Sequence, residues 1–504
     1  MKYTLTALLF LLIQSTSTAQ ASADKLLART MTKEAMLEDF NFLRKILEET
    51  HPALYRYTPK EAMQKKMDSI AGSFTRDMPF YDYYLTLASF ISDIRCAHTH
   101  IIPKGDLGGY LNEIKILPLE IIPIEDHMYI SVIGANDNTI LPGFELLAIN
   151  NQPVSEVKQQ IYSHLWGDGY IQTSKKALTY GNLFGLYYYL MVERPDSFLL
   201  KLRNLEGAIV EKKIPAIKRN EYVPIMFKNP VNKRVISLYK EKNKKDQKNG
   251  WRLEMLKEPG TALLRITGFG GGKNEEEAVA KMRTFMEGNI TRLKNKNIKN
   301  LIIDLRNNGG GWDIQGVELF TYLMQDTTPV HYFKRQYTIT DSSEFFKYSD
   351  LSAEDKASAR EKLIPQGDGT FNLKEEYTSE LKLQYPKTNR FTGKIYFLVN
   401  GGSGSTTSEF TAVAHSNNIG VFIGEETGGA YEGDNGGHFL HFELPNSRIS
   451  VGTVLISYMN AVKTPAQMGR GVIPDYNVLL TKEDLLNARD TQLEFTLDLI
   501  RKKK

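Results

Sequence analysis

The spacing of apolar residues changes three times along the chain. Over residues 32–92, apolar side chains recur every three to four positions, which predicts amphipathic helices. Over residues 116–149 they fall into short runs separated by turns, which predicts strands, and a helix is expected to follow over about 155–165. Over residues 251–472, apolar runs alternate with helical spacing, which is typical of an α/β core.

This pattern predicts a multidomain α/β protein. The expected order is an N-terminal helical domain, a β-rich module and an α/β core, followed by one C-terminal helix. The predicted boundaries are a signal peptide at 1–21, the helical domain at 24–104, the β-rich module at 112–217, the core at 225–480 with a polar, irregular insertion at 341–392, and the C-terminal helix at 481–504.

The first residues predict export from the cytoplasm. Lys2 precedes an apolar run from Leu5 to Ile13, and small residues follow at Ala19 and Ala21, as in a signal peptide. The run is shorter than the about 20 residues that span a bilayer, and no later stretch reaches that length. No cysteine lies near the cleavage site to take a lipid, since Cys96 is the only one. We therefore expect a periplasmic or secreted protein without a membrane span.

Charge excludes one class of partner. The chain has 63 Lys and Arg against 59 Asp and Glu, a net charge of +4. The basic residues are scattered among acidic ones, and the basic C-terminus is typical of a solvated chain end. No nucleic-acid partner is expected.

A strand-to-helix turn near residue 405 is the first candidate for chemistry. An apolar strand at Ile395–Val399 leads into Gly-Gly-Ser-Gly-Ser, and a helix follows directly. Ser405 lies at the top of this turn, where the helix dipole and nearby amides favour an oxyanion. Thr406 and Glu409 also have the spacing of a capping box, so helix capping explains the hydroxyls about equally well at this stage.

A second turn of the core is rich in glycine. The segment Asn300–Trp312 contains a buried strand and then three glycines, whose successive amides can converge on an anionic oxygen. A flexible loop that needs positive φ angles is the alternative. A phosphate loop is disfavoured, because no Lys-Ser/Thr pair follows the glycines.

A third segment supplies candidate bases. Asp93–His100 contains His98 and His100, and a neutral histidine is the usual base for a nucleophilic serine. On an extended segment the two rings point the same way, which also suits a metal. His438 and His441 are possible third ligands, but an alternating strand would place them on opposite faces. A structural role for the histidines is the remaining alternative.

Five motifs in order carry a resemblance to a known family. The chain resembles the tail-specific, or C-terminal processing, serine peptidases, on the branch of the tricorn protease core and the photoreceptor retinoid-binding repeats. The motifs are PGFELLAINNQPVSEV at Pro142–Val157, IIDLRNNGGG at Ile302–Gly311, GGSGSTTSEF at Gly401–Phe410, IGEETGG at Ile423–Gly429 and GRGVIPD at Gly469–Asp475. The first resembles half of a PDZ module, and the resemblance implies a core of the crotonase-like ββα type.

The resemblance also implies site residues. One branch of the family uses a lysine base just after the Thr-Gly strand end, but Ala430 and Tyr431 stand there. The tricorn-like branch uses a histidine before the PDZ-like module, which here is His98. The nucleophile is then Ser405, and the amides of Gly310 and Thr406 form the oxyanion hole.

Two departures from the family pattern leave alternatives open. The family's serine often stands three residues before the helix glutamate, which here is Thr406, so Thr406 and Ser403 remain alternative nucleophiles. The acid that supports the histidine should precede the GRGVIPD motif, but Gln467 and Met468 stand there. The supporting acid is therefore unknown, with three candidates: Glu432, Asp434 and Asp93.

The predicted function is a secreted or periplasmic serine endopeptidase. It would hydrolyse peptide bonds in unstructured or C-terminal segments of proteins through an acyl-enzyme, without cofactor or metal. Its partner would be a polypeptide substrate held by the PDZ-like module. The alternative is a non-catalytic protein of the same fold that binds peptides or apolar ligands.

Overall fold

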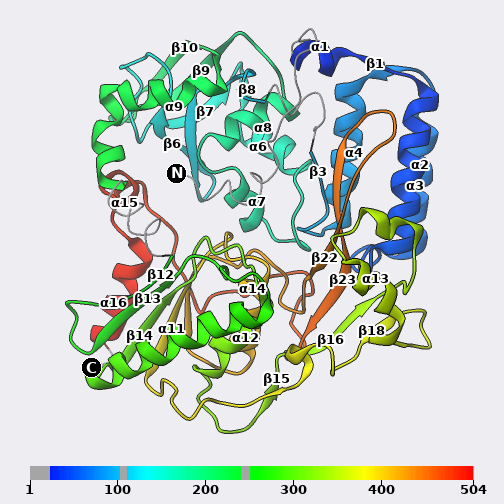
Figure 1. The fold of residues 1–504 in the computed structure, drawn as a ribbon. Coiled ribbons are helices and arrows are strands. Elements are labelled where there is room, and N and C mark those ends of the chain that lie inside the picture. The colour runs from blue at the N-terminus through cyan, green and yellow to red at the C-terminus, as the bar shows by residue number, and fades with distance from the viewer. Residues whose placement is uncertain (1–22, 103–110, 240–249, 503–504) are drawn as a thin grey trace.

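The computed structural model describes residues 23–102, 111–239 and 250–502. The predicted signal peptide lies outside the described residues. The protein is a mixed α/β structure with several sheets arranged around a central helix, α14 (Thr406–Ser416) (Figure 1). Within the described residues, none of the helices is both long and apolar enough to cross a membrane.

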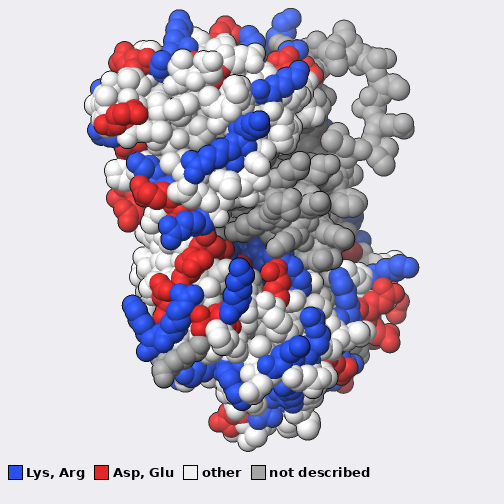
Figure 2. Space-filling view, turned by 90° about the vertical axis from the view of Figure 1, so that its left-hand side faces the viewer, with Lys and Arg blue, Asp and Glu red and all other residues white. Residues whose placement is uncertain are grey.

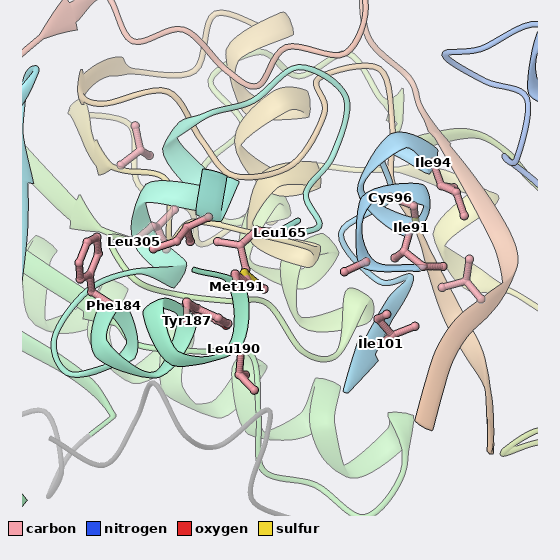
Figure 3. Packing of buried hydrophobic residues seen from close by; sticks show 14 of the residues in the cluster. Ile91, Ile94, Cys96, Ile101, Leu165, Phe184, Tyr187, Leu190, Met191 and Leu305 are labelled. Atoms are coloured by element: carbon pink, nitrogen blue, oxygen red, sulfur yellow. The ribbon is translucent and has the colours of Figure 1, made fainter. Parts of the chain in front are cut away.

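The N-terminal region is helical. Three helices pack together through edge-to-face aromatic contacts of Phe40 with Phe74 and Phe90, which hide their apolar stripes from water. The last of them ends at Arg95, which adopts a left-handed conformation, and the chain then continues toward Ile101 in the interior (Figure 3). The elements are α1 (Ala23–Ala28), β1 (Thr30–Met31), α2 (Lys33–Thr50), α3 (Lys60–Ser73), β2 (Met78–Pro79) and α4 (Phe80–Ile94).

The second region is a sheet with helices packed on it. Its strand order is β10-β9-β7-β6-β5, with β8 paired to β7, and the helix expected at 155–165 is present as α6. Its strands are β5 (Leu119–Ile124), β6 (His127–Ile133), β7 (Glu145–Ile149), β8 (Gln152–Pro153), β9 (Ser197–Arg203) and β10 (Ile209–Pro215), beside the pair β4 (Lys115–Ile116) and β11 (Ile217–Lys218). Its helices are α6 (Val154–Tyr162), α7 (Thr173–Leu178), α8 (Leu183–Met191) and α9 (Arg219–Lys228).

The third region is the α/β core. Its strand order is β12-β13-β14-β20-β21-β24, and all neighbours are parallel except β12 and β13. The strands are β12 (Trp251–Met255), β13 (Thr261–Ile266), β14 (Asn300–Asp304), β20 (Lys394–Val399), β21 (Val421–Gly424) and β24 (Tyr476–Asn477). Side chains that alternate along the strands pack α16 (Thr491–Lys502) on one face and α11 (Glu275–Asn295), α12 (Asp313–Thr321) and α14 on the other.

The C-terminal segment differs from the prediction of one helix over 481–504. It forms two helices, α15 (Lys482–Asn487) and α16, because Ala488 takes a left-handed conformation that ends the first one. Ile500 of the second helix is buried against the core sheet.

A further sheet joins the core to the helical domain. Its order is β17-β18-β16-β23-β22, and β3 pairs with β23, so the long β22–β23 hairpin lies beside α4 (Figure 1). The strands are β3 (His100–Ile102), β16 (Phe333–Thr338), β17 (Leu363–Pro365), β18 (Phe371–Leu373), β22 (Asn435–Glu443) and β23 (Ser450–Asn460).

The segment 341–392 is more regular than its polar sequence predicts. It contributes two short strands to this sheet and four short helices. Because only one face of such an edge packs on the protein, its sequence lacks the apolar runs that mark the core. The helices are η2 (Glu344–Tyr348), α13 (Ala353–Ser358), η3 (Ala359–Lys362) and η4 (Ser379–Leu381), and the pair β15 (Val330–His331) and β19 (Leu383–Gln384) completes the region.

Candidate active site

Ser405 occupies a strained position between β20 and α14. Its φ of 50° and ψ of −134° are unusual for a residue with a side chain and cost about 1 to 3 kcal/mol. Such strain at a strand-to-helix turn exposes a nucleophilic hydroxyl in other enzymes. The Ser405 side chain makes no capping bond, and among the described residues its Oγ has no hydrogen-bond partner. Ser405 is half-buried, and its hydroxyl is free to react.

The two alternative hydroxyls are engaged and buried. Thr406 Oγ1 lies 2.9 Å from the Gly311 carbonyl oxygen and 2.6 Å from Asp313 Oδ1. Ser403 Oγ donates to the Leu305 carbonyl oxygen at 2.9 Å. The capping box expected from Thr406 and Glu409 is absent, because Thr406 is already the first helical residue and the Glu409 amide donates to the Ser405 carbonyl.

The glycine loop lies against the serine turn. Strands β14 and β20 are parallel neighbours with Asp304 opposite Leu398, so the loops that follow them leave the same edge of the sheet. The Gly404 amide donates to the Asn308 carbonyl and links the two loops. Gly310 has a φ of 97°, and a Cβ there would lie 2.7 Å from Ser405 Cβ. Only glycine allows this approach.

The two predicted oxyanion donors differ in the structure. The Thr406 amide has no hydrogen-bond acceptor within the part of the chain that the structure describes, and it follows Ser405 directly. The Gly310 amide donates to Asn308 Oδ1 at 3.0 Å. The Thr406 amide is thus free to stabilise an oxyanion. The Gly310 amide can do so only if it breaks or shares its hydrogen bond to Asn308.

The structure places His98 beside an acid. His98 lies in the turn between α4 and β3, and its Nδ1 is 3.4 Å from Asp434 Oδ1, just before β22. Burial lowers the pKa of His98, but the charge of Asp434, with a lesser contribution from Asp168, outweighs it and raises the pKa to about 9. Asp434 itself is only 2% exposed. Burial raises the pKa of Asp434, and the opposing charge of His98 brings the net shift below the usual range.

The other two candidate acids have different partners. Asp93 forms an ion pair with Lys66. Glu432 accepts hydrogen bonds from the Tyr57 hydroxyl at 3.0 Å and from the Gly469 amide at 2.8 Å. Asp434 is therefore the candidate that contacts His98.

Asp168 is a further acid near His98 that was not identified from the sequence. Asp168 Oδ1 accepts a hydrogen bond from the Ala97 amide at 2.7 Å, one residue before His98. Burial, and then the charge of Asp434, raise the pKa of Asp168 to about 8. No motif indicates this residue, because it follows α6 in a different region of the chain.

Two other candidate histidines have different contacts. The His100 ring packs 5.4 Å from Trp166, and burial, followed by the charges of His441 and His98, lowers the pKa of His100 to about 4. His438 Nδ1 is 3.2 Å from Asp350 Oδ1 on the surface. His100 is thus positioned as a packing residue of β3.

A pocket connects the serine turn to the acid. It has a volume of about 520 Å³, and its wall includes both Ser405 and Asp434. His98 adjoins this wall through Asp434 and through the ring of Phe439, whose centroid is 5.8 Å away. The arrangement brings together a free hydroxyl, a free amide and a histidine–carboxylate pair, which are the groups that acyl transfer requires.

Comparison with known proteins agrees with this chemistry. Residues 260–478 match peptidase family S41. The fold is similar to crystal structures of CPAF: a CPAF mutant has a TM-score of 0.59, mature CPAF 0.56 and mature CPAF complexed with lactacystin 0.55. Each is 15% identical to the chain, and each alignment covers 93% of this chain and 97 to 98% of the other. No curated protein matches the sequence.

Proposed function

The chain is a serine-type peptidase of family S41, and on that premise we propose that it hydrolyses peptide bonds in unstructured or C-terminal segments of proteins, with Ser405 as the nucleophile. The observation that carries the proposal is the strained, unengaged Ser405 hydroxyl in a pocket shared with Asp434, the partner of His98. A non-catalytic binder is not favoured, since the family match is to peptidases.

The proposed reaction proceeds in two halves. Ser405 Oγ bonds to the substrate carbonyl carbon while His98 accepts its proton, and the His98 imidazolium then protonates the leaving amine as the C–N bond breaks. Water, deprotonated by His98, hydrolyses the resulting ester and restores the serine. The Thr406 amide stabilises the oxyanion, and Gly310 joins it once its amide leaves Asn308 Oδ1.

Asp434 is the proposed supporting acid for His98. A carboxylate near Nδ1 stabilises the imidazolium that forms when Ser405 loses its proton, and it favours the tautomer with a free Nε2. The 3.4 Å separation of His98 and Asp434 is longer than a short hydrogen bond, and such contacts tighten when substrate binds.

The β-rich module is proposed to hold the substrate. The segment at 142–157, with its PDZ-like sequence, spans β7, β8 and the start of α6, and β5 and β10 are the edges of its sheet. A PDZ-like module binds a peptide terminus by adding it as a strand to such an edge. We further propose that the core is of the crotonase-like ββα type and that the protein acts in the periplasm or after secretion, as its first residues indicate.

Hydrolysis of an unstructured protein tests the proposal. Purified protein should degrade casein, and the Ser405→Ala variant should not. If Ser405→Ala degrades casein as fast as the parent, the assignment of the nucleophile is wrong.

A further inference from the structure

The pocket beside Ser405 is strongly acidic. Among the described residues, its wall carries six carboxyl groups and one lysine or arginine, Lys362. The carboxyl groups are those of Glu275, Asp313, Asp355, Glu380, Glu409 and Asp434. The face of the molecule shown in Figure 2 differs, because basic and acidic side chains are interspersed on it.

Most of these carboxyl groups have no cation beside them. Lys362 is paired with Asp355 at 2.7 Å, and Asp434 faces His98. Within the described ranges, the other four have no lysine, arginine or histidine at ion-pair distance. Clustered carboxylates in a low-dielectric site repel one another, so the pocket is stabilised by any cation that enters it.

Glu409 is the most deeply placed of the four. It follows Ser405 by one turn of α14 and is 2% exposed, and it lines the pocket. Among the residues that the structure describes, its Oε2 has no hydrogen-bond partner. Asp434 Oδ2 is likewise buried and unpartnered. Burial and the neighbouring charge of Asp313 raise the pKa of Glu409 well above its usual range, so Glu409 holds a proton in the free pocket and releases it to solvent when a basic side chain arrives beside it. Buried oxygens without partners are the groups that an incoming donor satisfies.

The rest of the wall suits a long side chain. Trp312, Ile314, Phe439 and Leu455 line the same pocket as the acids. Apolar surfaces accommodate the methylene stem of lysine or arginine, and an aromatic ring attracts its charged end. No three of the described His, Cys, Asp and Glu residues are placed so that they could hold a metal ion together, although the six acids line one pocket. An organic cation, which needs only one or two of these carboxyl groups, suits this arrangement.

We propose that this pocket selects substrates with a lysine or arginine side chain within two residues of the scissile bond. The selectivity rests on the proposed function, since Ser405 defines where the bond lies. The basic group reaches toward Glu409, with Glu380 and Asp313 contributing further negative charge.

Matched peptides test the selectivity. In one series of fluorogenic peptides, each peptide carries a single arginine at a different position around the cleaved bond. A second series carries citrulline at the same positions, which has nearly the same shape without the charge. We expect kcat/KM to be at least about tenfold higher for arginine at one position, because a buried acid left unpaired disfavours the neutral analogue. The Glu409→Gln variant should bring this ratio close to one. The ratio is the readout, since a change in the fold alone lowers both rates together.

Glu380→Gln is the second variant, in case Glu409→Gln does not fold. It lies on η4, away from the nucleophile helix, and should reduce the ratio by a smaller factor. Equal cleavage of the arginine and citrulline peptides at every position would overturn the selectivity and leave the peptidase function intact.

A binding measurement distinguishes an error in the proposed selectivity from an error in the proposed peptidase function. Fluorescence anisotropy on the Ser405→Ala protein compares the same peptides without turnover. If the parent hydrolyses nothing but Ser405→Ala still prefers arginine, the proposed function is wrong and with it the selection of a cleavage site, while the binding of basic side chains in the pocket is confirmed. If neither hydrolysis nor preferential binding is seen, both proposals are wrong.

Discussion

The nucleophile turn and the histidine–acid pair are built in different ways. The turn consists of two loops that leave adjacent parallel strands, β14 and β20, and Gly310 brings them into contact. The pair joins His98 to Asp434, and Asp168 from a third region supports it through the Ala97 amide. The difference teaches that local backbone geometry determines where the proposed nucleophile lies, whereas long-range packing determines which acid lies beside the proposed base.

Removal of the nucleophile should have the largest effect. Ser405→Ala should lower kcat/KM for peptide hydrolysis by about 10⁴-fold or more, because the covalent route is lost. Ser403→Ala is the matched control: it removes a buried hydroxyl whose bond is to Leu305, so it should lower the melting temperature and change kcat/KM by less than about tenfold. A reversed order of the two effects would move the nucleophile to Ser403.

Removal of the base should come next. His98→Ala should lower kcat/KM by about 10² to 10⁴-fold, the usual range for general base catalysis. His100→Ala, which removes a ring packed on Trp166, should lower stability and leave kcat/KM within about tenfold of the parent. Steady-state kinetics of both variants should be measured at a pH where kcat/KM of the parent no longer rises. Full activity in His98→Ala would contradict its role as base.

Removal of the Asp434 charge should change the pH dependence of kcat/KM. His98 acts as a base only when neutral, so kcat/KM should rise with pH to a midpoint near the His98 pKa of about 9. In Asp434→Asn the charge that raises this pKa is gone and burial remains, so the midpoint should fall by about one pH unit or more. Asp168→Asn should shift it in the same direction by less. An unchanged midpoint in Asp434→Asn would mean that another group titrates.

The contact between the two loops predicts a smaller effect. Gly310→Ala would place a methyl group at 2.7 Å from Ser405 Cβ, at a φ of 97°, and should destabilise the protein by about 1 to 3 kcal/mol and reduce activity by about tenfold. Gly309→Ala is its control, because nothing lies within 4 Å of an added Cβ there. Thermal unfolding and steady-state kinetics should show lower stability and activity for Gly310→Ala than for Gly309→Ala.

The same contrast explains what the sequence could predict. The strand, turn and helix around Ser405 follow from apolar runs and glycines close in sequence, and α2, α4 and α6 follow from their periodicity. The choice of Asp434 over Glu432 and Asp93 could not be made, because it depends on which carboxylate the β22 turn brings to His98. Asp168 carries no local signal, and the acidic pocket joins residues from 275 to 434 that only the fold brings together.

Covalent labelling with a fluorophosphonate probe, followed by peptide mapping, tests the central claim most directly. We expect one adduct on Ser405 in the parent protein and strongly reduced labelling in His98→Ala, because the hydroxyl is then no longer activated. An adduct on Thr406 or Ser403, or no adduct under conditions that label a control serine hydrolase, would contradict it.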